Sequence, residues 1–180
     1  MQVHFDLKAG IQFSGDIGPE AKKALDAAVA EANDKLFTRG VPKGVPAEEV
    51  GRITWWETEG SHLSLEIRSG GFTRAHDALF RFRKHVAQAL GKYHLGVREI
   101  TVKSFSVILA GDVPEGAIPR IPFITGTVRE AGGVRLDLSV TTQDLENRVP
   151  DRIVKLIEEK VQAASYGGKT EHWELMYESP

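Results

Sequence analysis

Apolar and polar residues alternate along several stretches of this chain. In the first stretch the apolar residues are Val3, Phe5, Leu7, Ala9, Ile11 and Phe13. Successive side chains of a strand point to opposite faces, so this pattern predicts a strand with one buried and one solvated face, as in an antiparallel sheet. We expect further strands at residues 53–57, 62–68, 97–109, 134–140 and 173–177. Within 97–109 the apolar parity changes between Val102 and Phe105, which predicts a β-bulge.

Three stretches carry helix signals. The first follows Pro19 and covers 21–37, the second covers 74–90 with Thr73 as its N-cap and Gly91 as its stop, and the third runs from Pro150 to Gly167-Gly168. The resulting order is strand, helix, two strands, helix, three strands, helix, strand, in which one of the three consecutive strands, beside 97–109 and 134–140, is expected without definite bounds. Few strands are separated by a single helix. The order therefore favours an α+β fold, a mostly antiparallel sheet with helices on one face, over a doubly wound parallel sheet.

Length and composition narrow the class of protein. With 180 residues the chain can bury a proper core and has the size of one domain, which we take to span residues 1–180. It contains no cysteine, which excludes disulfides, thiol catalysis and thiolate-bound zinc within it. No apolar run approaches the roughly 20 residues that cross a bilayer, and the first residues do not form a signal peptide. We therefore expect a cytoplasmic protein that does not enter a membrane.

The charges of the chain are unevenly distributed. Its formal net charge is −2, but residues 68–103 contain eight basic and only two acidic side chains, while the remaining residues contain fifteen basic and twenty-three acidic ones. A basic middle segment within an acidic protein indicates a polyanionic partner.

Much of this positive charge lies on one side of the predicted helix 74–90. At 100° per residue, one stripe is formed by the apolar residues Ala75, Ala78, Leu79, Phe82, Val86, Ala89 and Leu90. The opposite side carries Arg74, Asp77, Arg81, Lys84, Gln88 and Lys92, and Arg98 follows just beyond the next turn. A merely solvated helix face usually mixes charges of both signs. Here one acid stands among the cations, which favours binding to nucleic-acid phosphates. The candidate residues are Arg74, Arg81, Lys84, Lys92 and Arg98.

No catalytic or metal-binding arrangement is visible. The histidines lack the spacing and the carboxylate partner of a zinc site; they include His76, His85, His94 and His172. The segment Gly167-Gly168-Lys169-Thr170 looks like the end of a phosphate-binding loop, but Ala163 stands where the first glycine is needed. Ser106, His62 and Asp112 are not accompanied by the Gly-x-Ser-x-Gly of a nucleophile elbow.

The neighbouring Trp55 and Trp56 lie in a predicted strand, so their side chains point to opposite sides of it. We expect one of them in the core and the other near the basic turn or at an interface. The predicted sheet lacks the central aromatic pair of RNA-recognition sheets. Contacts to an RNA backbone are therefore expected more than base stacking.

Three long stretches of the chain resemble one protein family. They are the opening VHFDLKAGIQFS with the later EANDKLFTRGVP, the stretch RAHDALFRFRKHVAQALGKYHLGVREITVKSF at 74–105, and the stretch NRVPDRIVKLIEEKVQAASYGGKTEHWELMYESP at 147–180. In this order they are similar to the N-terminal domain of the methanogenic-type seryl-tRNA synthetase of archaea. The resemblance covers essentially the whole chain.

The resemblance implies an idiosyncratic tRNA-binding domain, an antiparallel sheet of about six strands capped on one face by a bundle of about three helices. In the family this domain binds serine tRNA, including its long variable arm. It presents the acceptor end to a class II catalytic core in the partner subunit of a homodimer. Matched by position, the family's tRNA contacts correspond to Arg81, Lys84 and Arg98, while Arg74 and Lys92 come from the helical pattern alone.

The resemblance also limits what this chain is expected to do by itself. The ATP, magnesium and zinc of the full-length family belong to the catalytic core, which would lie beyond residue 180. We therefore expect neither a cofactor nor catalysis within residues 1–180. Two other interpretations stay open. One is a free-standing RNA-binding or dimerisation module that uses Trp55–Trp56 as an interface. The other is a small enzyme, for which the sequence offers no polar pocket.

Overall fold

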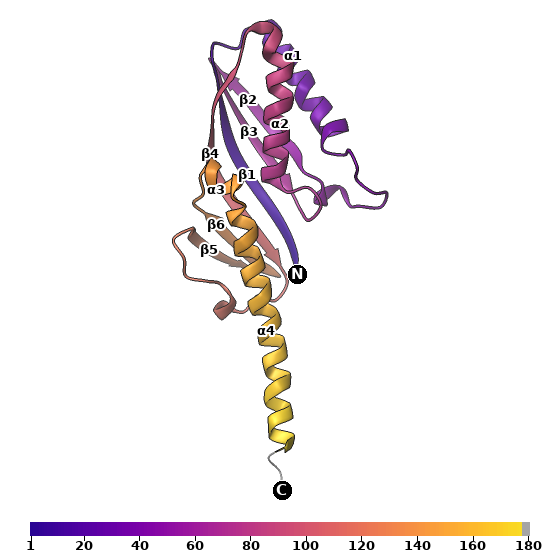
Figure 1. Cartoon of the computed structure of the whole chain (residues 1–180), viewed down its shortest axis with the longest axis vertical. Helices are drawn as coiled ribbons and strands as arrows, with labels where there is room; N and C mark the ends of the chain where they lie inside the picture. Colours follow the sequence, from indigo (N-terminus) through magenta and orange to yellow (C-terminus); the bar gives the residue numbers. More distant parts are fainter. Residues whose placement is uncertain (178–180) are drawn as a thin grey trace.

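The computed structural model describes the backbone of residues 1–177 and the side chains of residues 1–165. Within this part of the chain, six strands form one antiparallel sheet in the order β2-β3-β1-β4-β6-β5 (Figure 1). The strands are β1 (Gln2–Phe13), β2 (Arg52–Glu59), β3 (His62–Ser69), β4 (Val97–Ala110), β5 (Ile124–Glu130) and β6 (Gly133–Leu138). The two longest strands, β1 and β4, pair along almost their whole length and form the middle of the sheet.

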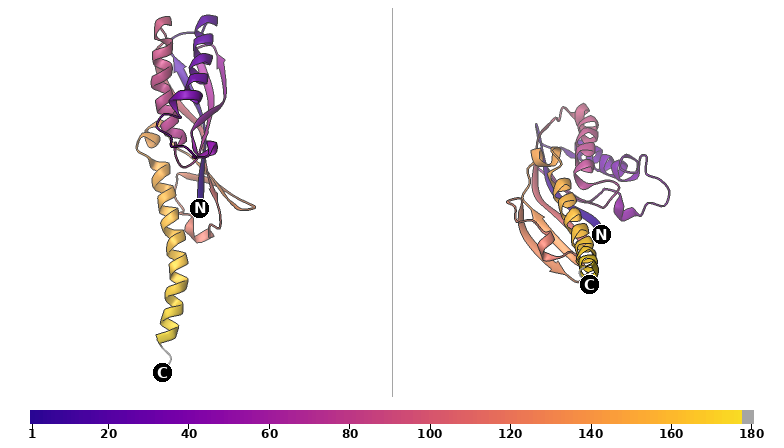
Figure 2. Two further views of the ribbon diagram at one scale, coloured as in Figure 1. Left: turned by 90° about the vertical axis from the view of Figure 1, so that its right-hand side faces the viewer. Right: turned by 60° about the horizontal axis from the view of Figure 1, so that its bottom comes forward.

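Helices cover one face of this sheet, as Figure 2 shows from two further sides. The described α-helices are α1 (Pro19–Glu31), α2 (Ala75–Leu90), α3 (Thr142–Glu146) and α4 (Val149–Tyr177). A π-helical turn at Ala32–Leu36 continues α1, and short 3-10 turns occupy Ala47–Glu49, Gly91–Tyr93 and Glu115–Ala117. The helices α1 and α2 pack against each other beside the β2, β3 and β1 strands, while α3 and α4 lie toward β4, β6 and β5. The predicted α+β class is therefore confirmed.

The core lies between the sheet and these helices. Its fully or almost fully buried side chains include the following residues of β1, β3, α2 and α4: Phe5, Leu7, Ile11, Phe13, Leu63, Leu65, Ile67, Leu79, Phe82, Val86, Ile153, Val154 and Ile157. These are the apolar positions of the alternating and helical patterns, which confirms the predicted periodicities. Burial of each such side chain contributes roughly 1.5–3 kcal/mol to stability.

Two irregularities interrupt the pairing of β1 with β4. Lys8 lies opposite Ser104 but Ala9 lies opposite Val102, so Lys103 has no partner on β1. The predicted bulge between Val102 and Phe105 is thus confirmed. Nearer the start of β4 the pairing shifts again and leaves Arg98 without a partner on β1. This second irregularity was not predicted, and both unpaired residues are basic.

Three local predictions were wrong. The helix α4 runs through Gly167-Gly168 to Tyr177, so the expected helix stop and the strand at 173–177 are absent. Alternation of three apolar residues in 173–177 was too short a pattern to distinguish a strand from a helix. Thr73 is buried and does not cap α2, whose N-cap position is Arg74 without a side-chain hydrogen bond.

The short helix α3 was also missed, although it carries a recognisable signal. The side chain of Thr141 accepts a hydrogen bond from the backbone N–H of Asp144, and the Asp144 carboxylate accepts one from the backbone N–H of Thr141. This reciprocal capping box is readable from the Thr-x-x-Asp spacing.

In the described part of the chain no helix combines the length and the apolar character that crossing a bilayer requires.

Candidate nucleic-acid interface

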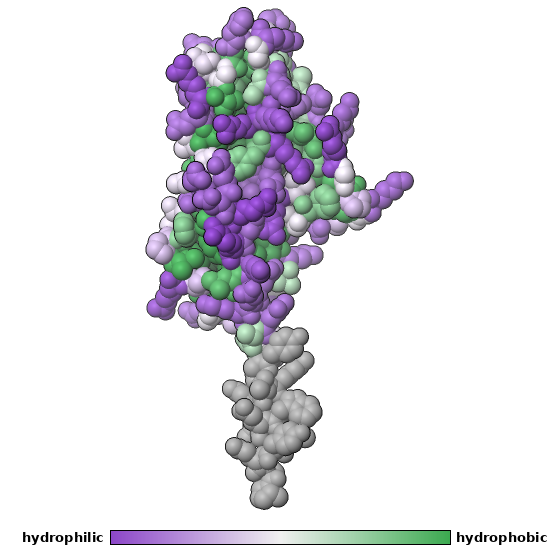
Figure 3. Space-filling model, in the orientation of Figure 1, coloured by the Kyte–Doolittle hydropathy of each residue, from purple (hydrophilic) through white to green (hydrophobic). Residues whose placement is uncertain are grey.

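The helix α2 is fixed to the protein by one apolar side. Leu79, Phe82 and Val86 are completely buried. Ala89, which also belongs to the predicted apolar stripe, is only half-buried. Because the buried stripe sets the rotation of the helix, the opposite side faces solvent. Figure 3 shows hydrophilic side chains on the outward surface in the region where Figure 1 places α2.

Arg81 and Lys84 are the exposed cations at the centre of this outward side. They are three residues apart, so they neighbour each other on the helix surface, with about 5–6 Å between Cβ atoms. Among residues 1–165, neither side chain forms an ion pair with a carboxylate. Two cations at this spacing, uncompensated among the described side chains, are chemically suited to an anionic ligand with repeated charges.

The predicted row continues past the end of α2. Lys92 lies in the 3-10 turn after the helix, where its Nζ is 5.3 Å from the centre of the Tyr93 ring. Arg98 is exposed at the second irregularity of β4. Neither of the two has a carboxylate partner among the side chains the structure describes.

Arg74 differs from the other four candidates. Its guanidinium forms an ion pair with the carboxylate of Asp151 in the first turn of α4. Its Cζ also lies 5.5 Å from the centre of the Phe5 ring, within the range of a cation–π contact. Only about a third of the Arg74 side chain is exposed. The structure thus places Arg74 in a contact between two helices.

Asp151 is the centre of this contact. His76, completely buried on α2, places its Nε2 3.4 Å from Asp151 and 3.6 Å from Asp77, and Arg148 lies 3.6–3.7 Å from the same two carboxylates. Burial raises the pKa of the Asp151 carboxyl, but His76 and Arg74 outweigh burial and bring the pKa below its ordinary value. The cluster joins the start of α2 to the start of α4.

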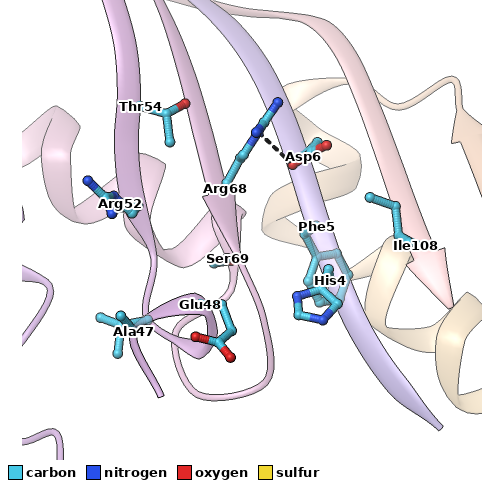
Figure 4. Close-up of a pocket in the computed structure, with 11 residues that line it drawn as sticks. His4, Phe5, Asp6, Ala47, Glu48, Arg52, Thr54, Arg68, Ser69 and Ile108 are labelled. Atoms are coloured by element: carbon cyan, nitrogen blue, oxygen red, sulfur yellow. Dashed lines mark ion pairs between the residues drawn. The ribbon is translucent and has the colours of Figure 1, made fainter. Parts of the chain in front are cut away.

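On the face of the sheet that the helices leave uncovered, two arginines are paired with carboxylates. Arg68 lies 3.3 Å from Asp6 and 2.9 Å from Glu66, and Figure 4 shows the Arg68–Asp6 pair in a shallow pocket of this face. Burial raises the pKa of the Asp6 carboxyl above its ordinary value, although Arg68 opposes this effect. Arg135 is likewise 3.4 Å from Asp137. These cations are compensated within the protein, unlike those of α2.

Neither of the paired tryptophans is buried. Trp55 is 46% exposed and Trp56 is 36% exposed, so the expectation that one of them belongs to the core is wrong. Trp56 leans toward α1, where its Nε1 donates a 2.9 Å hydrogen bond to Asp26. Both lie on β2, an edge strand, where a side chain has a neighbouring strand on one side only.

Other polar residues considered as catalytic or metal-binding candidates from the sequence form ordinary hydrogen bonds or are exposed to solvent. Ser106 donates a 2.9 Å hydrogen bond to Asp137, and the His62 ring lies 3.3 Å from Gln12. His94 is exposed in the turn after α2, and its backbone has the left-handed φ of 57°. The side chains of His172 and of the segment 167–170 lie outside the described ones.

Comparison with known proteins gives consistent matches over the chain. A family model described as a tRNA-binding domain matches residues 3–159. The type-2 serine–tRNA ligase of Methanococcoides burtonii is 38% identical over 180 residues, which cover 99% of this chain and 35% of the relative. That of Methanothrix thermoacetophila is 40% identical over 185 residues, with the same coverage. The chain therefore spans about a third of the length of these relatives.

A solved structure is similar as well. It is a complex of M. kandleri SerRS with A. aeolicus tRNASec, which matches with a TM-score of 0.79 and 28% sequence identity. The match covers 92% of this chain and 32% of the solved one.

Proposed function

Because this chain belongs to the tRNA-binding domain family, we propose that it binds the tRNA of a serine–tRNA ligase through the outward side of α2 and the turn that follows. The observation that carries this assignment is the set of exposed cations without carboxylate partners among residues 1–165. It comprises Arg81, Lys84, Lys92 and Arg98.

These cations suit the RNA backbone. A guanidinium can donate two parallel hydrogen bonds to a phosphate, and an ammonium adds a compact point charge. Because α2 is anchored by Leu79, Phe82 and Val86, the positions of Arg81 and Lys84 are fixed before the tRNA arrives. Little backbone entropy is then lost on binding.

Such contacts position a tRNA and carry little sequence information. The bases of an RNA duplex lie in a deep, narrow groove that side chains do not enter, so recognition depends on shape and on phosphate positions. We propose that the long variable arm of serine tRNA supplies that shape. The family resemblance supports this choice of tRNA, as does the similarity of almost the whole chain to about a third of the type-2 serine–tRNA ligases.

The ligase reaction is proposed for a longer protein that would contain this chain. The support is the likeness to type-2 serine–tRNA ligases, of which the chain spans about a third. By the same resemblance, that protein would be a cytoplasmic homodimer in which this domain serves the active site of the partner subunit. It would hold ATP, magnesium and zinc in its catalytic core, outside residues 1–180. A cysteine-bound zinc does not fit this chain, which has no cysteine.

The test of the proposed function compares three RNAs: a serine tRNA transcript, the same transcript without its long variable arm, and a tRNA that has only a short arm. We expect the first to bind at least tenfold more tightly than the other two. Equal affinity for all three would overturn the serine assignment and leave general tRNA binding. No binding to any of them would overturn the proposed function.

A second candidate function is a protein-interaction or dimerisation module, which the exposure of Trp55 and Trp56 favours. Gel filtration over a range of concentrations distinguishes it. A dimer that forms with rising concentration, ignores tRNA and is lost in the Trp56→Ala variant would support the module.

A further inference from the structure

The open face of the sheet holds a second combination of cations and an aromatic ring, opposite the helices. Trp55 on β2 pairs with Glu66 on β3, and Glu66 pairs with Lys8 on β1. Directly opposed residues of antiparallel strands point to the same face, so these three side chains form a row across the sheet. Trp55 is 46% exposed, and the Lys8 side chain is 60% exposed.

A fourth side chain is brought to this row by the bulge in β4. Lys103 has no partner on β1, and its Nζ donates a 2.8 Å hydrogen bond to Ser64 on β3. To reach Ser64 the side chain crosses β1 at Gly10, where an added Cβ would lie 2.6 Å from the His62 ring and 3.2 Å from Lys103 Cε. A bulge re-aims a side chain, and a glycine beneath it leaves the necessary room.

Lys8, Trp55, Ser64, Glu66 and Lys103 are among the residues that line a shallow hollow with a volume of about 450 Å³. Its lining includes the indole of Trp55, the side chains of Lys8 and Lys103, and Ser64, which accepts the hydrogen bond from Lys103. This volume is within the range of small-ligand sites. The hollow therefore has the size and the lining for one flat aromatic group with a negative charge attached.

The charge balance of the hollow is positive. Glu66 is its acidic lining residue, and the carboxylate of Glu66 is already bound by Arg68 at 2.9 Å, whereas Lys8 lies at 3.9 Å. Lys103 has no carboxylate partner in the part of the chain whose side chains are described. Two ammonium groups and one carboxylate thus line the hollow; Lys8 shares that carboxylate with Arg68, and Lys103 is the cation without a carboxylate among the described side chains.

We propose that this hollow binds one unpaired nucleotide of the bound RNA, with its base stacked on the indole of Trp55 and its phosphate between Lys8 and Lys103. This inference rests on the proposed function, because it takes RNA as the ligand. An aromatic platform with flanking cations is the usual construction of sites for single-stranded nucleic acid. The hollow would add a contact to a single-stranded segment while α2 holds phosphates on the other side of the sheet.

A protein partner fits this surface less well. The large exposed apolar residues of the described chain besides Trp55 are Met1, Trp56, Phe72, Val128 and Leu156. None of these lines the hollow, and Trp56 points to the opposite face of β2. A protein interface usually has a contiguous apolar centre, whereas in this hollow a single indole lies among charged side chains.

The adjacent tryptophans provide a matched pair for the test. The probe is a five-nucleotide oligoadenylate RNA, and its control is an abasic oligomer with the same length and charge. The readout is the indole N–H signals in ¹H–¹⁵N spectra of the 180-residue chain, assigned with single Trp→Phe variants. We expect oligoadenylate to shift the Trp55 signal and leave the Trp56 signal in place. The abasic oligomer should shift neither.

The oligoadenylate titration is repeated with variants of the protein. Trp55→Ala and Lys103→Ala should each weaken binding of the oligoadenylate about 10-fold, while Trp56→Ala should bind like the wild type. Equal weakening by Trp55→Ala and Trp56→Ala, or unchanged binding by Trp55→Ala, would overturn the stacking site. Loss of a concentration-dependent dimer in Trp55→Ala, with oligonucleotide binding intact, would assign the surface to a protein partner.

A separate variant keeps failure of this site distinct from failure of the proposed function. The double variant Arg81→Ala/Lys84→Ala should bind tRNA about 30- to 150-fold more weakly and keep the shift of the Trp55 signal with oligoadenylate. If Trp55→Ala binds the oligonucleotide normally while the double variant loses tRNA, the stacking site is wrong and the proposed function stands. If the double variant keeps full tRNA affinity, the role of α2 is wrong whatever Trp55 does.

Discussion

Arg74 and Asp151 form an ion pair between the residue that precedes α2 and the first turn of α4. The pair is largely removed from solvent, since 34% of the Arg74 side chain and 16% of the Asp151 side chain are exposed. In sequence, Arg74 belongs to the same basic row as Arg81 and Lys84. In the structure its charge is compensated by a carboxylate, so the row divides into a paired member and members that have no carboxylate partner among the described side chains.

This division predicts opposite effects for two arginine substitutions. Arg74→Ala should lower the free energy of unfolding by about 2 kcal/mol, because it removes the nearest of the cations around the half-buried Asp151. Arg81→Ala should change stability by less than about 0.5 kcal/mol and weaken tRNA binding by about 1–2 kcal/mol. Urea unfolding and tRNA titration of both variants check this. Equal stability of the two variants would show that the Arg74–Asp151 pair does not support the fold.

The same cluster predicts a dependence of stability on acid. The folded-state pKa of Asp151 lies below its ordinary value of 3.8. Its carboxylate therefore contributes stability that is fully present above pH 3.8 and is lost as the pH falls below 3.8 through the folded-state pKa. The stability difference between the wild type and Asp151→Asn should accordingly be largest near pH 6 and shrink below pH 3.8. Urea unfolding at several pH values measures it.

A matched control for this experiment is Asp34→Asn, which removes an exposed carboxylate that has no ion pair among the described side chains. Its stability should follow the wild type closely at every pH. A difference for Asp151→Asn that stays constant from pH 6 to pH 2.5 would contradict the assigned role of this carboxyl.

Close packing of the sheet predicts a strong effect at Gly133. A Cβ added there would clash with the backbone oxygen of Leu109 on the paired strand β4, and a backbone atom cannot move aside cheaply. Gly133→Ala should therefore destabilise the protein by about 2–3 kcal/mol. Gly116→Ala is the control, since nothing lies within 4 Å of its added Cβ. Thermal unfolding that gives the same Tm for both variants would refute this prediction.

Much of the fold could be predicted because hydrophobic periodicity and tertiary burial agree in β1, β3 and α2. The alternation in residues 3–13 marks the residues of β1 that are buried, and the parity change after Val102 marks the bulge at Lys103. The end of α4 could not be predicted in this way. Its two glycines resemble a helix stop, yet the helix continues through them, and glycine disfavours a helix interior by only about 1 kcal/mol.

The candidate site was predictable only in part. The helical pattern placed Arg81 and Lys84 on the exposed side of α2, as the structure has them. It could not show that Asp151, 77 residues farther along the chain, binds Arg74. Nor could it show that Lys8 and Lys103 line the same hollow as Trp55, because that depends on the pairing of β1 with β3 and β4.

The most direct measurement of the central claim is tRNA binding by the Arg81→Ala/Lys84→Ala variant across a series of salt concentrations, beside Arg83→Ala. Arg83 is an exposed arginine of the same helix that points about 160° away from Arg81. We predict that the double variant binds serine tRNA about 30- to 150-fold more weakly than the wild type. Its plot of log affinity against log salt should be shallower by nearly 2. Arg83→Ala should bind like the wild type with an unchanged slope, and all three proteins should have the same Tm. Unchanged affinity and slope in the double variant, or an equal loss per charge in Arg83→Ala, would contradict a tRNA site on the outward side of α2.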